Sequence, residues 1–122
     1  MSDPNRRERA KAMFEEVNGF PAPTDPPDFF QQASLDQVFG EVWTRSGLTQ
    51  KERRWITLTT IAMTGAETAM NVHIRSALGS GDITREELTE FCGHFAHYAG
   101  FPIATRFYHA FQRIVAELDA GS

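Results

Sequence analysis

Cysteine is almost absent from this sequence of 122 residues, because Cys92 is the only one. No disulfide can form within the chain, which is typical of a protein kept in a reducing compartment. No apolar stretch approaches the roughly 20 residues that span a bilayer, and residues 1–9 lack the apolar core of a signal peptide. We therefore expect a cytoplasmic protein with no membrane partner.

Positive charge is not in excess either. The formal net charge is −4, which gives no electrostatic reason to expect a nucleic-acid partner. Hydrophobic residues make up 41% and charged residues 23% of the chain, a balance typical of folded globular proteins. There is no internal repeat, and the length fits one domain over residues 1–122.

Period-two alternation, the signature of strands, is also missing, whereas apolar residues recur at helical spacing between capping residues. The sequence predicts an all-α fold of about six helices. They are expected to cover about residues 4–18, 29–39, 50–64, 70–78, 85–99 and 102–118. Asp3 should cap the first, Gly40 should interrupt the second, and the third is apolar nearly all round, which predicts burial.

Six helices leave more apolar surface than a chain of this length can cover alone. The third and fifth expected helices are the candidates for subunit contacts. A homo-oligomer is therefore expected rather than a monomer.

His73 is the most informative of the four histidines. It follows Met70 by three residues and precedes Ala77 by four, so it lies along the apolar face of its helix. A partly desolvated imidazole there can transfer protons as a catalytic group. The alternative is a hydrogen-bonded histidine in the core with a structural role.

His94 and Tyr98 are four residues apart in the fifth expected helix, so their side chains should be neighbours. Together they can present polar groups to one ligand. The alternative is that Tyr98 is a half-buried core aromatic and His94 a solvated residue.

Glu41, Trp43 and Arg45 lie beside the expected break at Gly40. Arg45 can hold a substrate carboxylate through two parallel hydrogen bonds, Glu41 can act as an acid or base, and Trp43 can wall a pocket. The alternative is a salt-bridged surface turn with one anchoring indole.

Signals for other chemistry are weak. No pair of histidines on one expected helix has carboxylate support at metal-ligand spacing, so no metal is expected. The sequence has no nucleophile elbow and no nucleotide fingerprint, and Cys92 falls in an apolar stripe, where a thiol is usually inert.

Five segments in order resemble motifs of the gamma-carboxymuconolactone decarboxylase family. They are Gly40–Leu48, Arg53–Leu58, Asn71–Ala77, Thr84–Leu88 and His94–Pro102. The resemblance covers about residues 39–118. It implies an AhpD-like helical fold, a trimer or hexamer, and decarboxylation of 4-carboxymuconolactone in aromatic catabolism without a cofactor.

The same superfamily includes peroxide-defence enzymes with a Cys-x-x-Cys-x-x-x-His motif. With His73 as its histidine, the two cysteine positions fall at Ala66 and Ala69, and a preceding glutamate falls at Arg54. Alanine supplies no thiolate, so thiol peroxidase chemistry is excluded at this site.

The leading hypothesis is a cofactor-independent lyase or isomerase acting on a small carboxylated lactone. His73, Glu41 and Arg45 are the expected catalytic residues, with His73 as proton donor and Arg45 as carboxylate clamp. Trp43, His94 and Tyr98 are expected to line the substrate pocket. The alternatives are an AhpD-like scaffold that binds or transforms another small molecule, and a purely structural oligomer.

Overall fold

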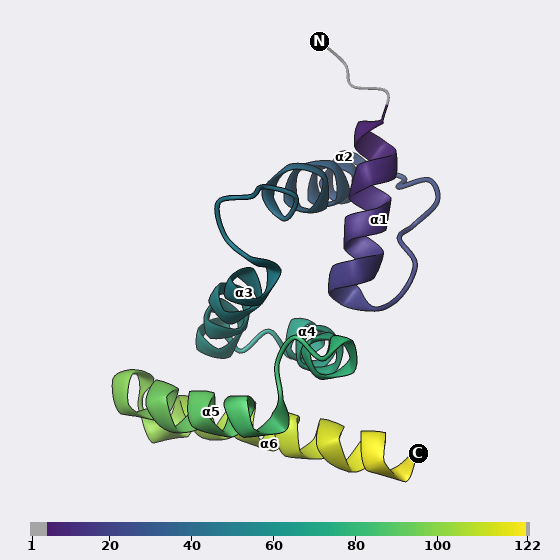
Figure 1. Ribbon diagram of the computed structural model, residues 1–122. Coiled ribbons are helices and arrows are strands. Elements are labelled where there is room, and N and C mark those ends of the chain that lie inside the picture. Colours follow the sequence, from purple (N-terminus) through teal and green to yellow (C-terminus); the bar gives the residue numbers. More distant parts are fainter. Residues whose placement is uncertain (1–4, 122) are drawn as a thin grey trace. The chain divides into compact units, whose positions relative to one another are not determined.

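The computed structural model describes residues 5–121 and is helical in character, with no strand among them (Figure 1). The chain divides into two compact units, residues 1–50 and 51–122. None of the helices in the described range is long and apolar enough to cross a membrane. The prediction of an all-α chain with about six helical segments is confirmed.

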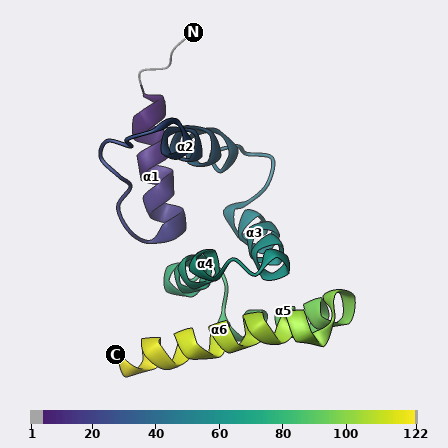
Figure 2. The ribbon, with the colours of Figure 1, turned by 180° about the vertical axis from the view of Figure 1, so that it is seen from behind.

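The first unit contains α1 (Arg6–Asn18), α2 (Phe29–Ala33) and the π-helical segment η1 (Ser34–Val42), which continues α2. The expected cap Asp3 lies outside the described residues. Asp28 caps α2 by accepting a hydrogen bond from the Gln31 backbone N–H at 2.9 Å, as its position before the helix indicates. α1 packs against η1 and crosses the helix that α2 and η1 form in both views (Figures 1 and 2).

The expected break at Gly40 is wrong, because η1 runs through this residue to Val42. A Cβ added at Gly40 would lie only 3.1 Å from the Cβ of Ala10, which is fully buried on α1. Gly40 therefore allows α1 and η1 to approach each other closely. The π-helical winding of η1 continues through this residue. Glycine in a helical pattern signalled a packing contact here, not a helix end.

Ion pairs and aromatic rings join the elements of the first unit. Arg7 forms two hydrogen bonds to Asp36, at 2.6 and 2.8 Å, and its guanidinium lowers the pKa of that carboxyl. Phe14 on α1 meets Phe39 on η1 edge to face, with ring centroids 5.0 Å apart. These contacts fix the face of η1 that packs on α1.

The second unit contains α3 (Gln50–Thr64), α4 (Glu67–Ser80), α5 (Arg85–Ala99) and α6 (Phe101–Ala120). α5 runs alongside α6 in both views (Figures 1 and 2). A capping box starts α5, because the Thr84 hydroxyl and the Glu87 carboxylate each accept a hydrogen bond from the other residue's backbone N–H. The core is built from the apolar stripes of all four helices.

We expected α3 to be buried on nearly all sides, and for the described residues this prediction is wrong. Leu58, Ile61 and Ala62 are buried, whereas the side chains of Ile56 and Met63 are about half exposed. The other helices of the unit cover only one face of α3. Apolar residues on the outer face are what the predicted subunit contact requires, and that contact stays a prediction.

The turn between α3 and α4 depends on Gly65. Its φ angle is +71°, and an added Cβ would collide with the Arg106 guanidinium of α6.

We expect Gly65→Ala to destabilise the fold by about 1–3 kcal/mol. The matched control is Gly93→Ala on α5, where a Cβ meets nothing within 4 Å and should stabilise the helix by about 0.5–1 kcal/mol. Urea unfolding of both variants checks this, and equal shifts would contradict it.

Candidate functional site

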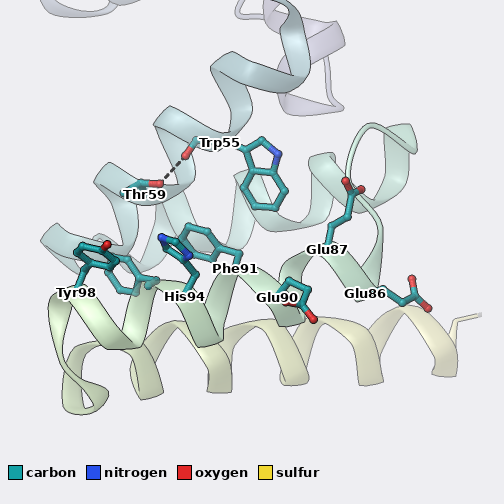
Figure 3. A pocket seen from close by; sticks show the side chains of 9 residues that line it. Trp55, Thr59, Glu86, Glu87, Glu90, Phe91, His94 and Tyr98 are labelled. Carbon is teal, nitrogen blue, oxygen red and sulfur yellow. Dashed lines mark hydrogen bonds between the residues drawn. The ribbon is translucent and has the colours of Figure 1, made fainter.

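A groove open to solvent runs along α3 and α5 of the second unit, with a volume of about 760 Å³. The rings of Trp55, Phe91 and Phe95 give it an apolar floor, and Phe91 stacks on both of the others at centroid distances of 5.5 and 5.4 Å. Figure 3 shows Trp55 coming from α3 and facing Phe91 of α5. The groove can hold a planar, largely apolar ligand or side chain.

His94 and Tyr98 lie together at one end of this groove (Figure 3). Their rings are stacked with centroids 5.2 Å apart and an interplanar angle of 16°. The expected contact between them is confirmed, and both side chains are exposed, Tyr98 by 86%. Their role in binding substrate stays a prediction.

Three glutamates also line the groove: Glu86 and Glu87 lie at the other end, and Glu90 lies between them and His94 (Figure 3). Glu87 is already engaged, because it pairs with Lys51 at 2.5 Å and completes the capping box of α5. These contacts lower the pKa of its carboxyl. Carboxylates along the groove repel an anionic ligand.

His73 lies on α4, half-buried among the residues of its apolar face. Burial, and then the positive charge of Arg54, lower the pKa of its imidazole from 6.5 to about 4. The side chain is therefore neutral at neutral pH in the ligand-free chain. The predicted partial desolvation is confirmed, and the neutral imidazole offers one N–H donor and one acceptor nitrogen.

Arg54 is a buried cation that the sequence pattern did not single out as a functional residue. It is 2% exposed, and its Nε donates a hydrogen bond to Asp82 at 2.7 Å. Its two neighbours in sequence, Arg53 and Trp55, are partly exposed, so nothing in the local pattern marked which of the two arginines points inward. The groove floor was missed for a similar reason, since Trp55, Phe91 and Phe95 fit an ordinary core stripe.

The other expected catalytic residues belong to the first unit. Glu41 is exposed and forms an ion pair with Arg6 at 2.8 Å, and Arg45 is exposed. Trp43 is 8% exposed and packs with Val17 and Phe39 in the core of that unit. The structural alternative, a salt-bridged segment with an anchoring indole, accounts for Glu41 and Trp43, while catalytic and binding roles for the three residues stay predictions.

The family to which the chain belongs follows from comparison with known proteins. The model of the carboxymuconolactone decarboxylase family matches residues 30–113, which is most of the chain. This chain belongs to the carboxymuconolactone decarboxylase family. The expected family resemblance is thereby confirmed, and the matched residues include His73, Arg54 and the whole groove.

Two relatives carry names that describe a reaction. The chain is 31% identical over 89 residues to 4-carboxymuconolactone decarboxylase of Acinetobacter baylyi, covering 73% of this chain and 66% of that protein. It is 35% identical over 72 residues to nitrosuccinic acid decarboxylase of Metarhizium robertsii, covering 59% of this chain and 50% of that protein. The matched part thus spans between half and just under two thirds of the length of these two relatives.

Among members of the carboxymuconolactone decarboxylase family and its superfamily, thiol chemistry would need reactive cysteines. Here Ala66 precedes α4 and Ala69 packs against the core. Cys92 is buried on α5, and burial raises the pKa of its thiol to about 11. The thiol is therefore protonated and shielded at neutral pH, as its position in an apolar stripe indicated.

The low pKa of His73 predicts how stability depends on pH. The unfolded chain binds a proton at this residue near pH 6.5 and the folded chain near pH 4, so the free energy of unfolding should fall as pH drops through this window. The loss is at most about 3 kcal/mol. His73→Gln should flatten the plot of unfolding free energy against pH between pH 6.5 and 4. Denaturant unfolding at several pH values measures this plot. Parallel plots for the variant and the unaltered chain would show that His73 does not titrate in this range.

Proposed function

We propose that this chain is a cofactor-independent decarboxylase acting on a small carboxylated substrate. The observation that carries the proposal is that both named relatives are decarboxylases, although one is named for a lactone and the other for a nitro acid. Lactone and nitro groups both withdraw electrons, so each can take up the electron pair left when carbon dioxide departs. A small carboxylated lactone such as 4-carboxymuconolactone is the proposed substrate.

The chemistry needs a cation to hold the carboxylate and a group to return a proton to carbon. For Arg45, which is exposed, we propose the first role, because its planar guanidinium matches a carboxylate with two hydrogen bonds. For His73 we propose the second. For Glu41 we propose a role as an acid or base, and for Trp43, His94 and Tyr98 contact with the substrate.

The direct test is to incubate the full chain separately with 4-carboxymuconolactone and with nitrosuccinate. We expect release of carbon dioxide from at least one, with loss of ultraviolet absorbance for the lactone, and an unchanged rate after dialysis against a chelator. Heat-denatured protein is the control for spontaneous decarboxylation. Rates equal to that control with both acids would overturn the proposal.

A second candidate is binding or conversion of another small molecule without decarboxylation. The groove between α3 and α5 favours it, because its floor is aromatic and three of its lining residues are glutamates, which suits an apolar ligand better than an anion. Tryptophan fluorescence separates the two. Quenching by an uncharged aromatic compound but not by carboxylated lactones would favour this candidate.

We also propose that the chain assembles into a trimer or hexamer. Support comes from the exposed apolar side chains of Ile56 and Met63 on α3 and from the open aromatic groove beside them. Light scattering should give three or six times the chain mass of 13.7 kDa. Ile56→Lys should shift the assembly toward smaller species because a charge at an apolar contact is costly. A monomer at micromolar concentration would contradict the assembly.

A further inference from the structure

Arg54 is a fully buried cation that the proposed chemistry has not used. Its side chain is 1% exposed, and its partner Asp82, in the turn after α4, is 29% exposed. Removing a guanidinium from water is expensive unless its hydrogen bonds are made inside the protein. The 2.7 Å bond from Arg54 Nε to Asp82 meets part of that requirement and fixes the direction of the guanidinium.

The guanidinium lies against the side of α4 that carries His73. Arg54 Nη1 is 3.5 Å from the hydroxyl of Ser76, a buried residue of α4. Ser76 follows His73 by three residues, and residues at this spacing are neighbours on one side of a helix. The contact to Ser76 therefore places a fixed positive charge beside the imidazole.

The remaining charges around His73 do not cancel this effect. On its own helix, Arg75 is paired with Glu117 of α6. Asp82, in the turn after α4, forms its ion pair with Arg54. Arg54, on α3, is the charged residue that lowers the pKa of His73. Burial and Arg54 act in the same direction, which is why the pKa falls to about 4.

We infer that the Arg54–Asp82 pair is a positioning element that holds a positive charge beside the His73 imidazole and, together with burial, disfavours its protonation, so that a carboxylate beside His73 would favour uptake of a proton. The second half of this inference rests on the proposed function. A substrate carboxylate would offset the field of Arg54 and favour the imidazolium. Binding of the substrate would thus load the proton donor.

The proton balance of decarboxylation fits this sequence of events. The carbon–carboxylate bond breaks, carbon dioxide leaves, and the electron pair stays in the substrate, where a carbon–hydrogen bond then forms. One proton is consumed in each turnover. In the proposed sequence it comes from solvent, resides on His73 in the complex and passes to the substrate carbon, which leaves His73 neutral again.

The resting state is tested by titrating His73 with proton–nitrogen NMR, its signal being assigned from its loss in His73→Gln. We expect a midpoint near pH 4 in the unaltered chain. Two neutral replacements of the pair, Arg54→Gln with Asp82→Asn and Arg54→Met with Asp82→Leu, should raise the midpoint, because they remove the positive charge while His73 stays buried. If one of these two double variants does not fold, the other still tests the inference. Arg54→Lys keeps the charge and should keep the midpoint low.

An unaltered midpoint in a folded neutral pair, or a His73 that titrates near pH 6.5 in the unaltered chain, would overturn the inference. The ligand-linked half is tested with succinate at pH 6.5, which should move the His73 signals toward the imidazolium position. No movement overturns that half. Failure to release carbon dioxide would overturn the proposed function alone, because the titration of the free chain needs no substrate.

Discussion

His73→Gln should lower turnover of a decarboxylated substrate by about 10²–10⁴-fold, the range expected when a proton-transfer group is removed. The fold should survive, because His73 is neutral in the resting chain and glutamine is also a neutral side chain with a donor and an acceptor. The measurement is single-turnover release of carbon dioxide, taken beside a thermal unfolding curve of the same sample.

The matched control is His109→Gln on α6, which makes the same substitution at an exposed position. It should change neither turnover nor melting temperature. If His73 is instead a structural residue, His73→Gln would lower the melting temperature by several degrees, as for about 1 kcal/mol in a small domain, and turnover would stay within about twofold. That outcome would remove His73 from the site.

Local signals predicted the helices well, because the start and the end of a helix depend on residues that are close in the sequence. The capping box of Thr84 and Glu87 starts α5, and the positive φ angles of Gly19 and Gly81 end α1 and α4. Gly40 shows where such reasoning fails. Its glycine serves contact with Ala10 on α1, thirty residues earlier, and no local pattern carries that information.

The candidate site was predictable only in part, for a related reason. Helical spacing was enough to predict that His94 and Tyr98 would meet and that His73 would be desolvated. Which of two adjacent arginines is buried depends on Asp82 and Ser76, which lie more than twenty residues away. The field that sets the pKa of His73 is thus a property of the tertiary structure.

The groove also depends on tertiary packing, and a substitution beneath it should have the largest effect on stability. Phe107 on α6 is fully buried, and its ring meets that of Phe91 in the groove floor at 5.1 Å between centroids. Phe107→Ala removes most of a buried ring and leaves a cavity. We expect it to lower the free energy of unfolding by about 3–5 kcal/mol.

The matched control is Phe101→Ala, the same change on the same helix at a residue that is 62% exposed, which should cost less than about 1 kcal/mol. Differential scanning calorimetry should show a fall of roughly 10–25 °C for Phe107→Ala and only a few degrees for the control. Loss of the support under Phe91 should also weaken the ordered stack with Trp55, which near-ultraviolet circular dichroism detects. Equal melting temperatures for the two variants would mean that α6 does not pack beneath the groove as described, and the groove could then not hold a fixed shape for any ligand.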